Sequence, residues 1–148
     1  MIGFIVTGHG QFAAGLASAV HMIAGDKPHF QAITFEEEDA DSFGPALAGA
    51  IEQMRAECDG VLIFADLLGG TPFNQAVMAA QSQSNVEVIA GVNLPILIEL
   101  CTRRKDNTSL EKLRDTALKI GKVSISVTNP AELAADDADE GTDDGEGI

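Results

Sequence analysis

The order of apolar and amphipathic segments is the feature that most restricts how this chain can fold. Four short apolar runs rich in β-forming residues lie at positions 2–7, 29–35, 60–65 and 86–90. Between them, apolar residues recur at helical spacing over positions 12–23, 43–54 and 72–83. This alternation predicts an α/β fold, an open parallel sheet with helices on both faces and right-handed crossovers. We expect the flavodoxin-like strand order 2-1-3-4, which makes the first and third strands neighbours.

The last third of the chain adds two helical segments, at 95–104 and 109–119, and one short alternating segment. In that segment Val123, Ile125 and Val127 alternate with polar residues, which predicts a β-strand with one apolar face. No helix is expected after it, so it must pair with an existing sheet edge. Residues 131–148 are dominated by Ala, Asp, Glu and Gly, and we expect a disordered acidic tail after a single domain of residues 1–130.

Charge and composition exclude several classes of partner. The 148 residues carry a formal net charge of -14. Nucleic acids and anionic membranes require clustered Lys and Arg, so we expect neither as a partner. No cluster of metal-ligand residues is visible, and Cys58 and Cys101 lie far apart, typical of free thiols in a reducing cytosol. No basic secretory start and no membrane-length apolar run is present, so we expect a cytoplasmic protein.

A histidine and an aspartate follow the two strands that we expect to be neighbours. His9 lies between Gly8 and Gly10 after the first apolar run, and Asp66 directly follows the third. The carboxyl ends of adjacent parallel strands meet at one edge, so we expect the imidazole and the carboxylate to be within reach of each other. On position alone, a solvated turn histidine and a capping aspartate explain these residues equally well.

The loops after the third and fourth runs indicate two further helix starts at the same edge. Gly69 and Gly70 permit a tight loop, Thr71 is a candidate cap, and Pro72 suits a first helical position. Asn93 precedes another helix that begins near a proline. Each sequence alone is an ordinary helix start. Together with the helix after Gly10, they predict a site rich in backbone N–H groups, suited to a phosphoryl group.

A dinucleotide-binding fingerprint competes with this interpretation. Gly8, Gly10 and Ala13 satisfy the G-x-G-x-x-A pattern, and Glu36 ends the second strand, where a ribose-binding acid would lie. The pattern alone is weak. It gives no role to His9 and does not explain the glycines after Asp66, so a dinucleotide module remains the alternative of a different class.

Taken in order, these motifs resemble the IIA domain of the mannose family of the bacterial phosphoenolpyruvate-dependent sugar phosphotransferase system (PTS). The resemblance rests on Gly8-His9-Gly10, on Asp66 with the segment Gly69-Gly70-Thr71-Pro72-Phe73-Asn74, and on Gly91-Val92-Asn93-Leu94-Pro95. It implies that His9 accepts a phosphoryl group from the phosphocarrier HPr and passes it to a IIB protein. It also implies that Asp66 orients the ring, with no cofactor or metal, and that the glycines, Thr71, Pro72, Asn74 and Asn93 surround the phosphoryl group or a partner.

The resemblance also implies an assembly. Family members are homodimers that exchange a C-terminal strand, to which residues 123–127 correspond, and the membrane proteins IIC and IID move the sugar. Because the chain ends in an acidic tail, we expect IIB to be a separate polypeptide and this protein to associate peripherally with the transporter. Leu67 and Leu68 depart from the best-known member. The phosphotransfer subunit of dihydroxyacetone kinase is the runner-up within this class.

Two groups of charged or titratable residues are expected to be unimportant for the chemistry. His21 and His29 have no glycine loop and no evident carboxylate partner. The run Arg103-Arg104-Lys105 is expected to be a favourable charge cluster at a helix C-terminus rather than a binding patch.

Overall fold

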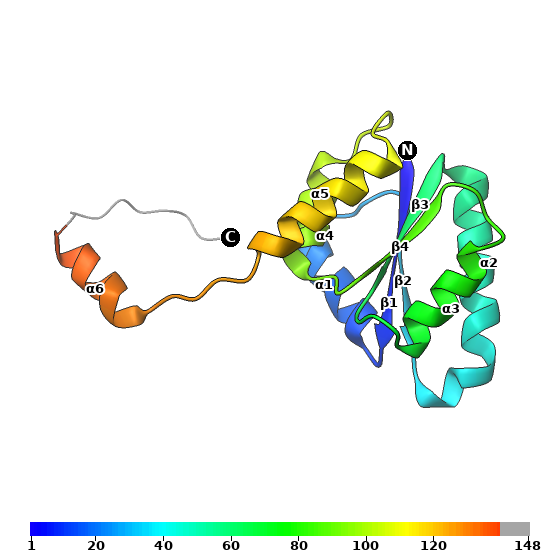
Figure 1. Ribbon diagram of the computed structural model, residues 1–148, viewed down its shortest axis with the longest axis horizontal. Helices are drawn as coiled ribbons and strands as arrows, with labels where there is room; N and C mark the ends of the chain where they lie inside the picture. The colour runs from blue at the N-terminus through cyan, green and yellow to red at the C-terminus, as the bar shows by residue number, and fades with distance from the viewer. Residues whose placement is uncertain (140–148) are drawn as a thin grey trace.

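The computed structural model describes residues 1–139 and contains one parallel sheet between two layers of helices (Figure 1). The strands are β1 (Ile2–His9), β2 (Phe30–Phe35), β3 (Gly60–Ala65) and β4 (Val86–Ala90). Their order is β2-β1-β3-β4, which confirms the predicted flavodoxin-like arrangement. The register pairs Thr7 with Ala65 and His9 with Phe35, so the last residues of these strands share one edge, called here the carboxyl edge.

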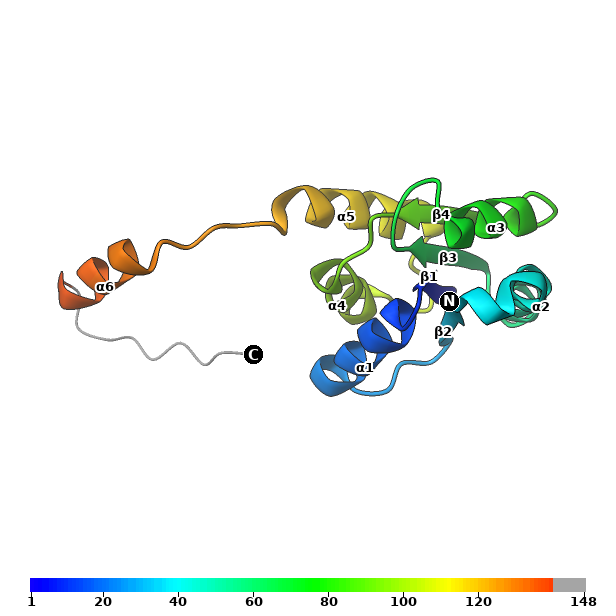
Figure 2. The same cartoon turned by 90° about the horizontal axis from the view of Figure 1, so that it is seen from below.

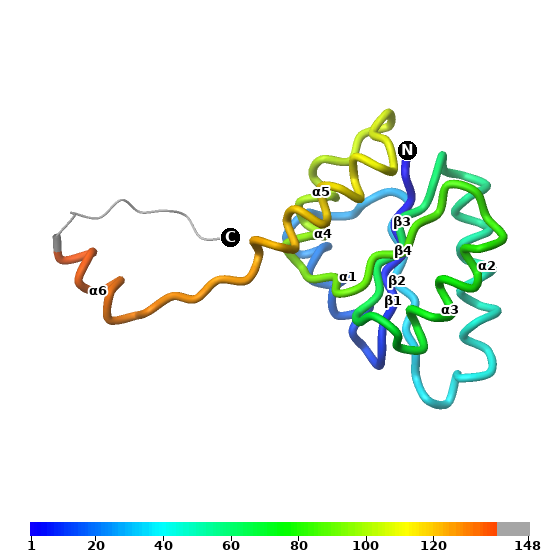
Figure 3. Tube along the Cα trace, viewed as in Figure 1, coloured from blue at the N-terminus to red at the C-terminus, as the bar shows by residue number. Residues whose placement is uncertain are grey.

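Helices cover both faces of the sheet, as predicted. One face carries α1 (Phe12–Ala24), α4 (Leu94–Arg103) and α5 (Leu110–Val123), and the other carries α2 (Ala40–Glu57) and α3 (Thr71–Ala80) (Figure 2). A short 3-10 helix, Glu37–Asp39, leads into α2. The turns after β1 and β3 lie together at the carboxyl edge, and the N-terminus lies at the opposite, amino edge (Figure 3).

Successive residues of β1 pack into different cores because side chains alternate across a sheet. Phe4 and Val6 are buried with residues of α1, α4 and α5, whereas Ile5 is buried with residues of α2 and α3. Every residue of β3 is buried, which explains why the run at 60–65 is apolar without alternation. The site at the carboxyl edge therefore rests on strands fixed from both faces.

Arg104 has a structural role that the charge cluster predicted for residues 103–105 does not include. Its side chain is buried at the amino edge and donates hydrogen bonds to the carbonyl oxygens of Ile2 (2.9 Å), His29 (3.1 Å) and Pro28 (2.5 Å). Its guanidinium lies 4.3 Å from the centre of the Phe4 ring. Burial lowers the pKa of Arg104, and backbone carbonyls rather than a carboxylate solvate the cation. Arg104 does lie at the C-terminus of α4, as predicted, but its side chain binds carbonyl groups of other segments.

The strand predicted at residues 123–127 is absent from the described chain. Helix α5 continues to Val123, and residues 124–129 have no regular structure. Ser124 is fixed just after the helix, since it accepts a hydrogen bond from Nδ2 of Asn93 (2.7 Å) and donates one to Gly121 (3.1 Å). No sheet edge of this chain covers the apolar side chains, and Val123, Ile125 and Val127 are 71%, 89% and 96% exposed.

The acidic tail is also more ordered than predicted at its start, because helix α6 (Pro130–Asp139) forms there (Figure 1). The side chain of Asn129 accepts a hydrogen bond from the N–H of Ala131 (3.0 Å), and proline suits the first helical position. Four alanines in the segment favour the helix locally. The rest of the predicted tail, residues 140–148, lies outside the described residues.

Candidate functional site

His9 and Asp66 are in direct contact at the carboxyl edge, as the strand order predicts. The carboxylate oxygen Oδ2 of Asp66 lies 2.7 Å from Nδ1 of the His9 ring and accepts the backbone N–H of the same residue at 2.9 Å. The other oxygen, Oδ1, accepts the N–H of Leu67 at 2.9 Å. One carboxylate therefore fixes both the main chain and the ring of His9.

The electrostatics of Asp66 favour a permanent anion. Burial acts to raise the pKa of Asp66, but the hydrogen bonds from the His9 N–H, the His9 ring and the Leu67 N–H outweigh it and hold that pKa below its ordinary value. An ionised carboxylate can only accept, so it selects the tautomer in which Nδ1 of His9 carries the proton. Nε2 then presents a lone pair, and the His9 side chain is 47% exposed while that of Asp66 is 10% exposed.

Neighbouring groups further restrict the ring. Phe35 packs edge-on against His9 with ring centres 5.7 Å apart. A Cβ on Gly70 would lie 2.8 Å from Cε1 of His9, and a Cβ on Gly8 would lie 2.7 Å from Phe12 and 3.0 Å from Asp66. A side chain at either position would therefore displace a neighbour, the His9 ring at Gly70 and Phe12 or Asp66 at Gly8.

The sequence motifs did not reveal the contacts of Phe35 and Gly70 with the ring. The register could have pointed to Phe35, since it is the last residue of β2 and pairs with His9, the last residue of β1.

Other predicted site residues, Gly10, Gly69 and Asn74, stabilise the loops that follow β1 and β3. The N–H of Gly10 is bound to the carbonyl of Phe35 (2.7 Å), and Gly10 has a φ of +53°, which suits glycine. Nδ2 of Asn74 donates a hydrogen bond to the carbonyl oxygen of Gly69 (3.0 Å). The residue Gly69 has a φ of +80°. These residues shape the loops around His9, and the Gly10 N–H is not free for a phosphoryl group.

The helix starts follow the prediction with one correction. Gly70, rather than Thr71, is the N-cap of α3, and no side chain caps that helix. Thr71 is the first residue of α3, and Pro72 follows it and is buried. Asn93 caps α4 by accepting the N–H of Ile96 (3.1 Å), so its amide is used within the fold rather than against His9.

Glu36, His21 and His29 each have a polar partner in the structure. Oε1 of Glu36 accepts a hydrogen bond from the side chain of Gln11 (2.5 Å). Contrary to expectation, His21 and His29 each have a carboxylate nearby, Asp26 at 2.7 Å and Glu57 at 3.4 Å. Neither pair lies at the carboxyl edge, because His29 precedes β2 and His21 lies in the last turn of α1.

Residues 1–139 offer neither a metal site nor a membrane-spanning helix. No three His, Cys, Asp or Glu side chains in this part of the chain are placed to hold a metal ion. None of the helices described there combines the length and the apolar character needed to cross a bilayer.

Comparison with known proteins decides the family. The family described as "PTS system fructose IIA component" (EIIA-man) matches residues 3–118. The chain belongs to this mannose-type IIA family. The matched range contains His9, Asp66 and the loops around them. This assignment does not favour the dinucleotide alternative.

Curated relatives and solved structures agree with the mannose-type IIA assignment. The chain is 30% identical over 128 residues to the fructose-specific EIIA component of Bacillus subtilis (strain 168), covering 86% of each. It is 30% identical over 137 residues to the mannose-specific EIIAB component of Escherichia coli (strain K12). That alignment covers 90% of this chain but only 42% of the relative. The mannose/sorbose-specific IIA subunit from Enterococcus faecalis superimposes with a TM-score of 0.75 at 29% identity, over 86% of this chain and 94% of that one.

Proposed function

We propose that this mannose-type IIA protein is a phosphoryl carrier that accepts a phosphoryl group on Nε2 of His9 from phospho-HPr and transfers it to a IIB protein. The observation that carries the proposal is the contact between Asp66 and Nδ1 of His9. It leaves one ring nitrogen as the nucleophile, on a half-exposed ring at the carboxyl edge. The family assignment supplies the reaction class.

The transfer step follows from the tautomer. The lone pair on Nε2 of neutral His9 attacks phosphorus, and the bond between phosphorus and the donor nitrogen breaks with its electron pair returning to the donor. His9 becomes a phosphorylated, positively charged imidazole that keeps its proton on Nδ1. Asp66 stabilises this charge at hydrogen-bond distance. The reverse sequence, with IIB as acceptor, restores neutral His9.

Backbone N–H groups are the remaining source of stabilisation. A phosphoryl group adds a charge of roughly -1.5 to -2. The first N–H groups of α1 and α3 have no acceptor within their helices, and the helix dipoles direct positive potential toward the same edge. Thr71 and Phe73 are the residues of the first turn of α3 that retain an N–H, because Pro72 has none. The proposed step requires no metal or cofactor.

The partners are proteins, and the surface beside His9 suits such contacts. Leu67 and Leu68, the two residues after Asp66, are 49% and 75% exposed and form an apolar rim next to the end of β3. HPr and IIB would both cover this rim as they reach Nε2. We place the protein in the cytoplasm, acting with a IIB protein beside the membrane subunits IIC and IID.

The decisive experiment is phosphorylation by enzyme I, HPr and phosphoenolpyruvate. The protein should acquire one acid-labile, base-stable phosphoryl group, and His9→Ala should abolish it. His21→Ala is the matched control, because His21 also has a carboxylate 2.7 Å from Nδ1 but lies outside the carboxyl edge. Phosphorylation that survives His9→Ala, or that His21→Ala removes, would refute the assignment.

The assembly is a second part of this proposal. We infer a homodimer in which residues 123–127 of each chain cross to a sheet edge of the partner, because Val123, Ile125 and Val127 are exposed and no edge of their own chain covers them. Replacing Ile125 and Val127 by Ser should convert the dimer to monomer in sedimentation. Replacing the intervening polar residues Ser126 and Thr128 by Ala is the control, and it should leave the dimer intact. A dimer that persists in the first variant would place the interface elsewhere.

A further inference from the structure

Positive charge in this acidic protein is concentrated in one segment. Seven of the nine Lys and Arg residues lie between positions 103 and 122, which include only three acids, for a local net charge of +4. The rest of the chain carries -18. This segment comprises the end of α4, the loop that follows it and most of α5. The high net negative charge of the chain already favours solubility, so this basic region is a candidate for binding an anion.

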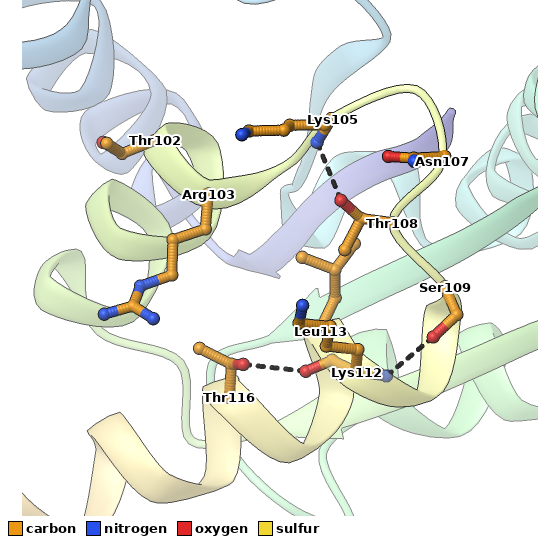
Figure 4. Close-up of a pocket in the computed structure, with 9 residues that line it drawn as sticks. All are labelled: Thr102, Arg103, Lys105, Asn107, Thr108, Ser109, Lys112, Leu113 and Thr116. Atoms are coloured by element: carbon orange, nitrogen blue, oxygen red, sulfur yellow. Dashed lines mark hydrogen bonds between the residues drawn. The ribbon is translucent and has the colours of Figure 1, made fainter.

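A hollow of about 670 Å³ lies in the middle of that region, between the last turn of α4 and the first turns of α5 (Figure 4). Its only charged lining residues are three cations, Arg103 and Lys105 on one side and Lys112 on the other. The other lining residues are mainly hydroxyl and amide side chains, including Thr102, Asn107, Thr108, Ser109 and Thr116. The volume is in the range of small-molecule sites rather than that of a single ion.

Most of the cationic hydrogen-bond donors in the hollow have no protein acceptor in the described part of the chain. Within residues 1–139, the ammonium groups of Lys105 and Lys112 have no ion pair or hydrogen bond to a protein acceptor. Arg103 pairs with Glu99 through Nε, which leaves the two terminal nitrogens of its guanidinium. The start of α5 adds the positive end of a 14-residue helix, with Ser109 already capping the N–H of Lys112 (3.2 Å).

A neighbouring hollow provides the internal contrast. On the other side of the loop at 105–109, a hollow of about 340 Å³ is lined by three acids, Asp59, Asp106 and Glu111, and by no cation. The two hollows share Asn107, Thr108 and Ser109. The same loop therefore separates a lining whose charged residues are all basic from one whose charged residues are all acidic, one of which, Asp59, pairs with the N-terminal ammonium (2.5 Å). This separation of charge favours a specific anion in the first hollow over diffuse attraction by the whole surface.

We propose that the basic hollow binds the phosphate group of a small phosphate monoester. The ammonium groups of Lys105 and Lys112 and the guanidinium of Arg103 can donate hydrogen bonds to phosphate oxygens. The positive end of the α5 dipole adds to their attraction for an anion. The surrounding hydroxyl and amide groups can bind the polar remainder of the molecule. The hollow is formed by α4, α5 and the loop between them, whereas His9 lies at the end of β1, so the two sites are distinct.

The test uses the full chain and glucose 6-phosphate, with glucose as the uncharged control. Titration followed by amide NMR shifts should give saturable changes at residues 103–112, and glucose should give none. Lys105→Gln with Lys112→Gln should weaken binding at least tenfold. Lys119→Gln with Lys122→Gln removes the same amount of charge from α5, outside the hollow, and should leave affinity within about twofold. Inorganic phosphate should bind more weakly than the ester.

Three results would overturn the proposal. Equal weakening by both double variants would show that attraction is diffuse. Saturable shifts centred on His9 and Asp66 would place the ester at the phosphorylation site. Shifts at residues 103–112 on neutralising Glu132, Asp136 and Asp137 without ligand would show that the acidic segment of the chain itself occupies the hollow. The binding measurements do not depend on phosphorylation of His9, so their outcome is independent of the test with His9→Ala.

Discussion

The two edges of the sheet each hold one charged side chain that the backbone solvates, with opposite signs. At the carboxyl edge, the anion of Asp66 accepts N–H groups from His9 and Leu67. At the amino edge, the cation of Arg104 donates to the carbonyls of Ile2, Pro28 and His29. The difference lies in what remains accessible. Asp66 has a half-exposed titratable ring bound to it, whereas Arg104 is 7% exposed and presents nothing to solvent.

This difference separates reactivity from stability. The Arg104 cation is hydrogen-bonded only to backbone carbonyls, so it connects the end of α4 to the starts of β1 and β2 and stabilises the fold. A charge that shares its hydrogen bonds with an exposed ring sets the chemistry of that ring. Substitutions at the two edges should therefore have effects of different kinds, and each prediction below tests that separation.

The largest effect on stability is expected at the amino edge. Arg104→Met removes the donor of three carbonyls and should lower the free energy of unfolding by about 3 kcal/mol, measured by urea denaturation. The adjacent Arg103→Gln is the control, since that side chain is exposed and pairs only with Glu99, and should cost less than ~0.5 kcal/mol. The folded fraction of Arg104→Met should still be phosphorylated normally. Slowed phosphotransfer in that fraction would show that the edges are coupled.

The converse result is expected for Asp66→Asn. An amide cannot accept all the bonds of the carboxylate and does not select the Nδ1–H tautomer of His9, so phosphotransfer should slow at least ~10-fold, or about 1.4 kcal/mol in the barrier. The loss of stability should be smaller than for Arg104→Met. Rapid-quench measurement of phosphorylation by phospho-HPr tests the rate. An unchanged rate would remove Asp66 from the mechanism.

Acid should reveal the stabilising role of Asp66. Because the folded-state pKa of Asp66 is lowered, its ionised form contributes stability above the ordinary aspartate pKa of ~3.9. That contribution is lost as the pH falls through the lower folded-state value. The difference in unfolding free energy between the wild type and Asp66→Asn should therefore shrink below about pH 4. A difference that stays constant into acid would contradict this origin.

The smallest expected effect is at Gly70. Its backbone suits any residue, but an added Cβ would lie 2.8 Å from Cε1 of His9, so Gly70→Ala should displace the ring and slow phosphotransfer a few-fold at nearly constant stability. Gly15→Ala, in α1 with no atom within 4 Å of the added Cβ, should not change the rate and should stabilise the helix by up to ~1 kcal/mol. Equal rates in both variants would mean that the ring tolerates displacement.

The sequence predicts the sheet and the central pair of the site because both depend on local patterns. Alternating apolar runs and helical periods predict an open parallel sheet, and the order 2-1-3-4 is a common arrangement of such sheets. That order brings His9 and Asp66 to adjacent strand ends. The burial of Arg104 was not predictable in this way, because it depends on three carbonyls about 75 or more residues away in sequence. At the end of an amphipathic helix, a buried arginine and an exposed one have the same local pattern.

The C-terminal segment shows the other limit. Alternation at residues 123–127 describes a segment that suits a sheet edge, but it does not specify which edge or which chain provides it. Without that edge, the helix capped by Ser109 extends to Val123. Likewise, the composition after residue 130 predicts little burial, yet the Asn129 cap and the alanines are sufficient for α6 in the structure.

The double attachment of Asp66 to His9 has a kinetic consequence. With Nδ1 bonded and the main chain fixed, the ring offers one atom in one direction, and the proposed donor and acceptor proteins must use the same approach. Under the proposed function the two partners cannot be bound together, so we expect ping-pong exchange in which one partner dissociates before the other binds. Either partner in the wrong phosphorylation state then acts as a competitive inhibitor. The rate of sugar uptake would depend on the ratio of charged to uncharged partners, and not only on their amounts.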